Sequence, residues 1–125
     1  MPPLLVRDVM TIGVPVCRDT EACGVVAARL NGEAVVVLDD DGMACGWVTR
    51  RNLLENAFRL VGDVMDEDIP TIQPEILAEA AAQIMRDRRV EYLFLMHSWP
   101  GEPRPSAVVS LKAIEGRLRG TEAAR

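Results

Sequence analysis

Apolar residues recur along the chain at two kinds of spacing, and these predict where strands and helices lie. Unbroken apolar runs are typical of buried strands, and they occur at 34–38, 44–48, 92–96 and 107–109. Recurrence every three to four residues is typical of helices, and it occurs at 22–30, 50–59, 77–85 and 111–118. Short extended pieces are expected at 14–16 and 69–72.

Each predicted long helix has one apolar face that is expected to pack against a sheet. In the first helix this face consists of Ala22, Val25, Val26 and Leu30. In the helix at 77–85 it consists of Leu77, Ala80, Ala81, Ile84 and Met85. In the helix at 50–59 it consists of Leu53, Leu54, Ala57 and Phe58. Phe58 is either a core residue, the interpretation that we favour, or part of a subunit interface.

The same order of elements occurs twice. Val6-Arg7-Asp8-Val9-Met10 opens the first copy, and Val61-Gly62-Asp63-Val64-Met65 opens the second, 55 residues later. Each opening is read as a short helix ending in methionine, and a β-α-β-β-α unit follows it. We expect an α/β (α+β) fold with repeats at 1–60 and 61–120 and a disordered polar tail at 121–125. One copy is too short to cover its sheet alone, so we expect the two to pack with pseudo-twofold symmetry.

The stretch from Gly46 to Leu54, which reads G-W-V-T-R-R-N-L-L, is predicted to run from a strand into a helix. Thr49 suits the N-cap, because its hydroxyl can accept a hydrogen bond from a backbone N–H of the first turn. Free N–H groups and the positive end of the helix dipole meet there beside Arg50 and Arg51, which suits a phosphate or another anion. For an isolated junction we favour the alternative, in which Thr49 only caps the helix and the arginines are solvated.

Composition and charge exclude several classes of function. The chain has 125 residues, is 49% hydrophobic and carries a formal net charge of −5, which argues against binding to nucleic acid or anionic membranes. No secretory signal and no run long enough to span a membrane is recognised, so a cytoplasmic location is expected. Cys17, Cys23 and Cys45 lack a C-x-x-C pairing and His97 is the single histidine, so no metal site is expected.

Two further patterns have simple explanations. The acidic turn Asp39-Asp40-Asp41-Gly42 is typical of a solvated hairpin tip and supplies too few fixed ligands for a cation. No nucleophile–base pair, metal cluster or pair of carboxylates in a cleft-like context is recognised, so the protein is not expected to be an enzyme.

The chain resembles a tandem pair of CBS domains, often called a Bateman module. The likeness covers residues 5–118 and rests on the D-V-M openings at 8–10 and 63–65, the D-D-G turn at 40–42 and the motif at 46–54. It implies a regulatory adenosyl ligand, such as AMP, ADP, ATP or S-adenosylmethionine, in the cleft between the repeats, and no required cofactor. It also implies homodimerisation through helices that carry apolar residues such as Leu54 and Phe58.

In the family, ribose and phosphate are bound by a Thr/Ser-x-x-Asp motif, often with a basic residue before the Asp. In the first copy Thr49 and Arg51 match this motif, and Asn52 replaces the carboxylate, which predicts weaker ribose binding. The first site would then consist of Thr49, Arg50, Arg51 and Asn52, with Val14, Pro15, Ala34, Val35 and Val36 around the base.

The second copy carries a weaker version of the same site. Ser110 and Lys112 match the motif, but Ala113 has no group that binds a ribose diol. The slot for the base would be lined by Ile69, Pro70, Val90, Tyr92 and Phe94. Tyr92 and Phe94 could stack on a base, although we favour the interpretation that they fill the slot.

Three aromatic or histidine side chains have no clear role. Trp47 is either a core residue or part of a subunit interface. Trp99, in the loop from His97 to Pro105, is either a contact for a partner or a lid on its own domain. His97 is read as a residue of the loop or the strand end.

Two functions are compatible with these features. The leading hypothesis is a small stand-alone sensor that binds an adenine nucleotide or adenosyl ligand and signals to a protein effector that the sequence does not identify. The alternative is a ligand-free, dimeric structural or interaction module that regulates a partner, which the changes at Asn52 and Ala113 favour.

Overall fold

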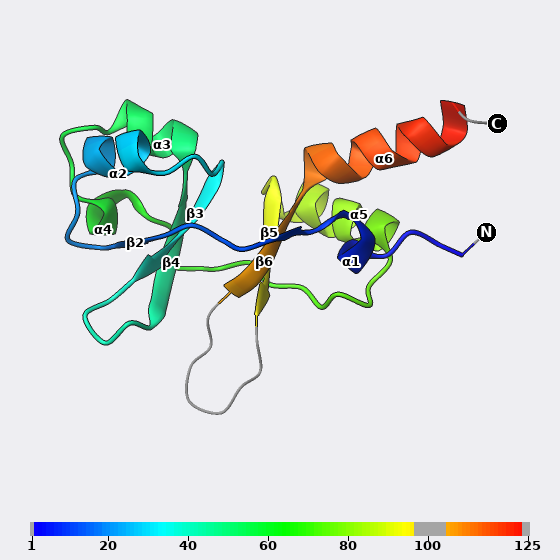
Figure 1. Cartoon of the computed structure of the whole chain (residues 1–125), viewed down its shortest axis with the longest axis horizontal. Helices are drawn as coiled ribbons and strands as arrows, with labels where there is room; N and C mark the ends of the chain where they lie inside the picture. Colours follow the sequence, from blue (N-terminus) through cyan, green and yellow to red (C-terminus); the bar gives the residue numbers. More distant parts are fainter. Residues whose placement is uncertain (1, 97–104, 124–125) are drawn as a thin grey trace. The chain divides into compact units, whose positions relative to one another are not determined.

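The structure, a computed structural model, describes residues 2–96 and 105–123. Its helices are α1 (Val6–Val9), α2 (Cys23–Arg29), α3 (Arg50–Glu55), α4 (Val61–Val64), α5 (Ala78–Arg88) and α6 (Leu111–Ala123). Its strands are β1 (Thr11–Ile12), β2 (Val16–Arg18), β3 (Ala34–Leu38), β4 (Ala44–Thr49), β5 (Tyr92–Met96) and β6 (Pro105–Ser110) (Figure 1).

These elements form two compact units, which are described separately below. The β3 unit contains Val14–Ile69 and Pro105, and the β5 unit contains the described residues up to Gly13, then Pro70–Met96 and the described residues from Ser106 onward. The short N-terminal stretch of the first repeat therefore folds with most of the second repeat. This mixture of helices with two small sheets is the α+β fold that the sequence predicts.

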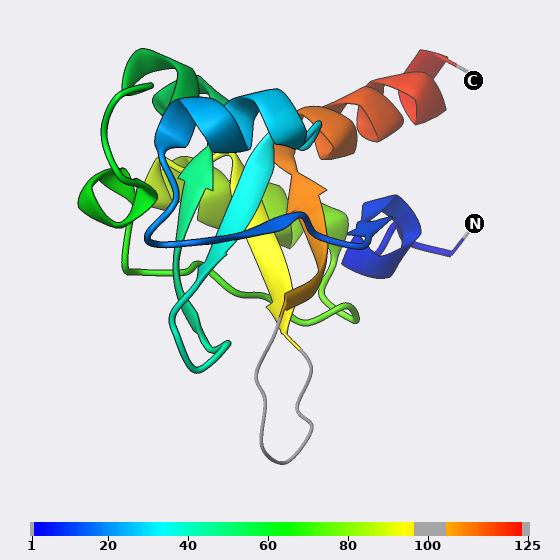
Figure 2. The ribbon, with the colours of Figure 1, turned by 60° about the vertical axis from the view of Figure 1, so that its left-hand side comes forward.

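The sheet of the β3 unit has the strand order β2-β3-β4. Strand β2 runs parallel to β3. Strand β3 runs antiparallel to β4 (Figure 2), and Val36 pairs with Trp47 in this register. Asp39 closes the β3–β4 hairpin, because its Oδ1 accepts hydrogen bonds from the N–H groups of Asp41 (2.9 Å) and Met43 (3.0 Å). The predicted hairpin is confirmed, and Gly42 at its tip has a φ of +79°.

One face of this sheet is covered by helices. Val35, Val37 and Val48 point from β3 and β4 into a core that α2, α3 and α4 complete. The helical residues in this core are Cys23, Val26, Ala27, Leu53 and Val61. Ala34 and Val36 alternate with these valines, so they lie on the opposite face of the sheet, and they are also buried.

The buried faces of the long helices differ from the predicted ones. Helix α5 buries Ala78, Ala81, Ala82 and Met85, whereas Leu77 and Ile84 are 46% and 38% exposed. In α2, Val26 is buried as predicted, but Val25 is 59% exposed. Small side chains allow a helix to approach a sheet closely, so in α5 the alanines occupy the contact that the larger residues were expected to make.

Helix α3 is shorter than predicted, and the interpretation of Phe58 as a core residue is wrong. The helix ends at Glu55, and Phe58 is fully exposed, at 102%. The residues after Glu55 leave the helix because their backbone carbonyls cap the start of α2. The N–H of Gly24 donates to the carbonyl of Ala57, and the N–H of Cys23 donates to the carbonyl of Arg59, both at 2.9 Å.

The sheet of the β5 unit has the order β1-β6-β5, and β1 pairs antiparallel with β6. Its core combines both strands of the β5–β6 pair with α1, α5 and α6, and consists mainly of Val6, Met85, Leu93, Leu95, Val109 and Ile114. Helix α6 continues to Ala123, so residues 121–123 are helical and not a disordered tail. No proline follows Leu118 to end the helix earlier.

The segment before each D-V-M opening supplies a backbone cap to a long helix. The segment before the first opening caps α5, and the segment before the second opening caps α2. Before the first opening, Leu4 accepts from the N–H of Ala78 (2.9 Å), and Leu5 bridges to Leu77 at the start of α5. Before the second, Arg59 accepts from the N–H of Cys23, and Leu60 bridges to Ala22 at the start of α2. Neither helix has a side-chain N-cap, so these backbone carbonyls take the place of one.

Gly46, the first residue of the G-W-V-T-R-R-N-L-L stretch, lies where there is no room for a side chain. A Cβ added at Gly46 would lie 2.6 Å from Met65 Sδ and 2.9 Å from the carbonyl oxygen of Asp66. We expect Gly46→Ala to lower the free energy of unfolding by about 1–3 kcal/mol, measured by urea denaturation.

Gly116→Ala is the matched control. A Cβ at Gly116 meets nothing within 4 Å, so this change in α6 is expected to raise stability by up to about 1 kcal/mol. Equal losses in the two variants would contradict the steric account of Gly46.

Candidate functional site

The junction between β4 and α3 has the predicted N-cap. The Oγ of Thr49 accepts a hydrogen bond from the N–H of Asn52 at 3.2 Å, and the backbone of Thr49 is extended. The N–H of Arg50 donates to the carbonyl of Glu33 at 2.9 Å, which ties the helix start to the beginning of β3. Thr49 is therefore confirmed as the residue that caps α3.

Arg50 has a structural role that the sequence did not reveal. Its Nη1 donates to the carbonyls of Ala27 (2.8 Å) and Leu30 (2.6 Å). These groups lie at the C-terminal end of α2, where helix carbonyls lack partners within the helix and a positive charge complements the dipole. The guanidinium of Arg50 therefore joins α3 to α2.

Arg51 and Asn52 face solvent beside the cap. The side chain of Arg51 is 87% exposed, and its Nε lies 3.2 Å from Glu55 Oε1, an ion pair between residues one helical turn apart. Among the described residues, the side-chain amide of Asn52 has no hydrogen-bond partner. The junction thus offers one exposed cation and one exposed amide next to the capping hydroxyl.

The residues predicted to surround a base lie in two different environments. Val14 and Pro15 are half-buried, and the ring of Pro15 packs so tightly on Gly32 that a Cβ there would collide with it. Ala34 and Val36 share one face of β3 with Trp47, which is opposite Val36 in β4. Val35 points into the helix-covered core on the other face, so the structure separates it from the remaining predicted residues.

The junction between β6 and α6 repeats this geometry in the β5 unit. The Oγ of Ser110 accepts from the N–H of Ala113 at 3.1 Å, and the N–H of Leu111 donates to the carbonyl of Glu91 at 2.9 Å. A hollow of about 250 Å³ lies at this junction. Its lining consists of Glu91, Tyr92, Ser110, Leu111, Lys112 and Glu115.

The other residues of the predicted second site are divided by burial. Phe94 is fully buried, whereas Tyr92 borders the hollow. Pro70 is buried, and its carbonyl accepts from the N–H of Phe94 at 2.8 Å. Ile69 and Val90 are half-buried.

Sequence reasoning missed the carboxylates of this second junction. Glu91 and Glu115 line the hollow, and Glu115 is also paired with Arg86 at 3.3 Å. The sequence indicates this only for Glu115, which lies one helical turn after Leu111 and therefore on the same face of the helix.

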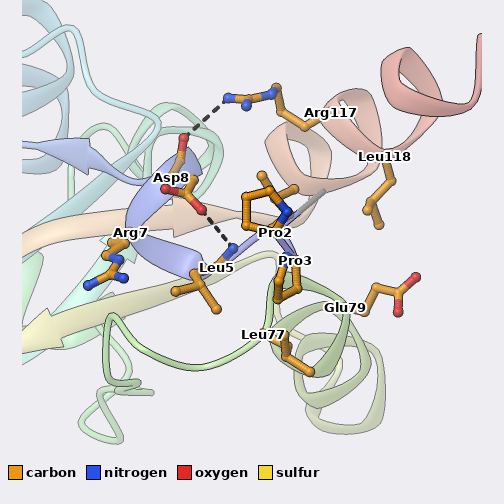
Figure 3. Close-up of a pocket in the computed structure, with 10 residues that line it drawn as sticks. Pro2, Pro3, Leu5, Arg7, Asp8, Leu77, Glu79, Arg117 and Leu118 are labelled. Carbon is orange, nitrogen blue, oxygen red and sulfur yellow. Dashed lines mark hydrogen bonds between the residues drawn. The ribbon is translucent and has the colours of Figure 1, made fainter. Parts of the chain in front are cut away.

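A larger hollow of about 880 Å³ lies elsewhere in the β5 unit (Figure 3). The N-terminal residues Pro2 to Leu5 border it together with the start of α5 and the side chains of Arg117 and Leu118. Arg117 donates to the carbonyl of Asp8 at 3.2 Å, and the carboxylate of Asp8 accepts from the N–H of Leu5 at 2.9 Å (Figure 3). No pattern in the sequence predicts this hollow.

Trp47 is a buried residue, with 7% of its surface exposed. Its indole N–H donates to the carbonyl of Asp68 at 3.0 Å, and its backbone pairs with Asp66. The predictions for His97 and Trp99 lie outside the described residues.

The three cysteines carry no sign of reactivity. Burial, reinforced by nearby Glu21, raises the pKa of the Cys17 thiol to about 12. Burial also raises the pKa of Cys23 and of Cys45, and none of the three thiols forms a disulfide.

Among the described residues, no group of His, Cys, Asp and Glu side chains is arranged to hold a metal ion. None of the described helices has the length and hydropathy needed to cross a membrane.

A sequence profile of the CBS domain matches the chain twice, at residues 6–59 and 61–118. The chain belongs to the CBS domain family. The two matches make it a tandem CBS pair, and CBS pairs are generally regulatory, non-catalytic modules. No curated protein sequence matches the chain.

Several solved structures share its fold. A CBS domain pair in complex with 5′-methylthioadenosine and S-adenosyl-L-methionine aligns with a TM-score of 0.81 at 16% identity, over 96% of this chain and 99% of that one. A CBS-domain containing protein from Agrobacterium tumefaciens aligns with a TM-score of 0.77 at 20% identity, over 91% and 92% of the two chains. The cytosolic domain of the Mg²⁺ channel MgtE, in complex with ATP, aligns with a TM-score of 0.68 at 17% identity, over 89% of this chain and 47% of that one.

The two adjacent arginines of this CBS pair are expected to differ in their effect on stability. Arg50→Ala removes two charged hydrogen bonds to helix carbonyls and is expected to cost about 1–3 kcal/mol. Arg51→Ala removes one exposed ion pair and is expected to change stability by less than about 0.5 kcal/mol. Urea denaturation of both variants measures the difference, and a loss at Arg51 as large as that at Arg50 would contradict these roles.

Proposed function

We propose that this CBS pair is a regulatory sensor that binds an adenine nucleotide or adenosyl ligand and signals its presence to a partner protein in the cytoplasm. The observation that carries the proposal is the β4–α3 junction, where the exposed guanidinium of Arg51 stands beside the cap formed by Thr49. Two structures with the same fold support the ligand class: the CBS domain pair solved with S-adenosyl-L-methionine and 5′-methylthioadenosine, and the cytosolic domain of MgtE solved with ATP. Unpaired thiols support a reducing compartment.

In this proposal each polar residue of the junction has one role. Arg51 binds the phosphates, because its guanidinium is a charged donor that no helix carbonyl occupies. Thr49 accepts from the N–H of Asn52, and its own O–H proton remains available to a phosphate or ribose oxygen. Asn52 binds one ribose hydroxyl through its amide. Arg50 leaves this set, since it holds the end of α2.

The base would contact apolar residues near the junction. Val14, Pro15, Ala34 and Val36 are the candidates, because Val35 points into the helix-covered core. Val14 and Pro15 are half-buried, whereas Ala34 and Val36 are buried and would contact a base only after a movement of the residues that cover them.

The second junction is proposed to bind anions more weakly. Lys112 supplies a cation there, but Glu91 and Glu115 line the same hollow and would repel phosphates. Ala113 also lacks an acceptor for a ribose diol. If one nucleotide binds, the first junction should therefore be occupied first.

Calorimetry with ATP and adenosine tests this assignment. Arg51→Ala is expected to weaken ATP binding by about 10-fold to 100-fold, the value of one charged hydrogen bond, and to leave adenosine binding unchanged. Lys112→Ala is the matched control at the second junction and is expected to retain ATP affinity. Loss of ATP binding in Lys112→Ala, with no change in Arg51→Ala, would show that the second junction is the site.

A second candidate function is a ligand-free, dimeric interaction module. The observation that favours it is the exposed apolar surface of the β3 unit, where Phe58 is 102% exposed and Leu54 is 58% exposed. Large exposed apolar side chains are typical of surfaces that contact other proteins. Under either function we propose that the protein is a homodimer.

Sedimentation velocity at micromolar concentration tests the dimer. We expect the wild-type protein to sediment as a dimer and Phe58→Ser to shift it toward monomer, because an exposed aromatic is a common anchor of interfaces. Ile12→Ser is the control, since Ile12 is 80% exposed but belongs to the β5 unit. A wild-type protein that sediments only as a monomer would contradict the proposal.

A further inference from the structure

One exposed connection in the β3 unit contains the dipeptide Asn31-Gly32. It joins α2, which ends at Arg29, to β3, which begins at Ala34. Asn31 is exposed, and both residues of the dipeptide lie outside helix and strand. Among the described residues, neither the side-chain amide of Asn31 nor the N–H of Gly32 has a hydrogen-bond partner. No such bond therefore holds these two neighbouring groups apart.

The residues on either side of the dipeptide are bound by Arg50. Its Nη1 donates to the carbonyl of Leu30 at 2.6 Å, and its backbone N–H donates to the carbonyl of Glu33 at 2.9 Å. Asn31 and Gly32 are the two residues between these carbonyls. The length of main chain between the carbonyls is therefore matched to a single residue of α3.

The packing of Gly32 requires a glycine after Asn31. The ring of Pro15 packs against Gly32, and a Cβ added there would collide with the ring. A side chain on the residue after an asparagine hinders the approach of that residue's backbone nitrogen to the asparagine side chain, and glycine has none. The contact with Pro15 therefore keeps beside Asn31 the residue that hinders such an approach least.

We infer that Asn31 is a site of spontaneous modification, in which the backbone nitrogen of Gly32 attacks the side-chain amide. A bond forms between this nitrogen and Cγ of Asn31, the bond from Cγ to Nδ2 breaks, and ammonia leaves with the proton of the attacking nitrogen. Water then opens the cyclic imide at one of its two carbonyls. Opening at Cγ gives aspartate, whereas opening at the main-chain carbonyl gives isoaspartate, whose main chain runs through Cβ and Cγ.

Both products alter the connection that Arg50 binds. Each adds one negative charge next to Leu30, whose carbonyl binds the guanidinium, in a chain of formal net charge −5. Isoaspartate also lengthens the main chain by one carbon, about 1.5 Å, between the two bound carbonyls. Because the ring of Pro15 leaves no space beside Gly32, the extra length is expected to break a hydrogen bond of Arg50. The inference does not depend on a ligand, so it stands apart from the proposed function.

Peptide mapping by mass spectrometry during incubation at mildly alkaline pH tests the modification. We expect Asn31 to gain the mass difference between an amide and a carboxyl group, and electron-based fragmentation to identify isoaspartate. The reaction should be faster at higher pH, because the attacking nitrogen has to lose its proton. Asn52 and Asn56 are internal controls that should stay unchanged, since neither is followed by glycine.

Incubation of the native protein beside protein unfolded in guanidinium chloride separates the folded connection from the dipeptide alone. Conversion of Asn31 in the native protein is the expected result. Conversion only in the unfolded chain would overturn the inference, because the folded connection would then block the attack, and conversion in neither sample would also overturn it. Asn31→Gln needs a larger ring for the same attack and should remain unmodified.

Urea denaturation of the aged protein tests the effect on Arg50. The isoaspartate form, separated by chromatography, is expected to unfold at a lower urea concentration than fresh protein. Asn31→Asp adds the charge without the extra main-chain carbon and should show a smaller decrease. In Arg50→Ala, isoaspartate should cause a smaller further loss, because the hydrogen bonds of the guanidinium are already absent. A wild-type midpoint for the isoaspartate form, or an equal loss in Arg50→Ala, would overturn this effect.

Discussion

The fold depends on backbone carbonyls that cap helices from a distance in sequence. Leu4 accepts from the N–H of Ala78, and Arg59 accepts from the N–H of Cys23, each at 2.9 Å. Both helices lack a side-chain cap, so without these segments their first N–H groups would lose a protein partner. This exchange explains why the chain up to Gly13 belongs to the β5 unit. It also explains why α3 stops at Glu55, because the residues after it are needed at α2.

The sequence predicts the local elements well, because they depend on local patterns. Strands β3 and β5 have the predicted bounds, since continuous β-branched and apolar runs leave few alternatives. The caps at Thr49 and Ser110 are also as predicted, because they require only a hydroxyl three residues before a helical N–H. The assignment to the CBS family rests on the same short motifs in their order.

The remaining features depend on contacts between distant residues, which spacing does not encode. Arg50 looks like an anion ligand in the sequence, but the carbonyls of Ala27 and Leu30 bind its guanidinium. Phe58 has the spacing of a core residue, but its neighbours leave the helix to cap α2. In α5 the alanines, and not the larger residues, face the sheet, because close approach to the strands was favoured over burial of Leu77 and Ile84.

The two strand-to-helix junctions share one backbone geometry but carry different charged side chains. Each has a capping hydroxyl and a backbone hydrogen bond of 2.9 Å from the first helical residue to the residue just before a strand, β3 in one unit and β5 in the other. The first then presents Arg51 and Asn52, and the second presents Lys112 among the carboxylates of Glu91 and Glu115. Since phosphate recognition depends on local charge, this difference is the reason that we propose the first junction, and not the second, as the anion site.

Nuclear magnetic resonance of ¹⁵N-labelled protein titrated with ATP tests the central claim most directly, because each junction has its own backbone amides. The account predicts concentration-dependent shifts for the amides of residues 49–52, with smaller changes at residues 110–113. Unchanged spectra at millimolar ATP, or shifts confined to residues 110–113, would contradict the assignment of the first junction as a nucleotide site.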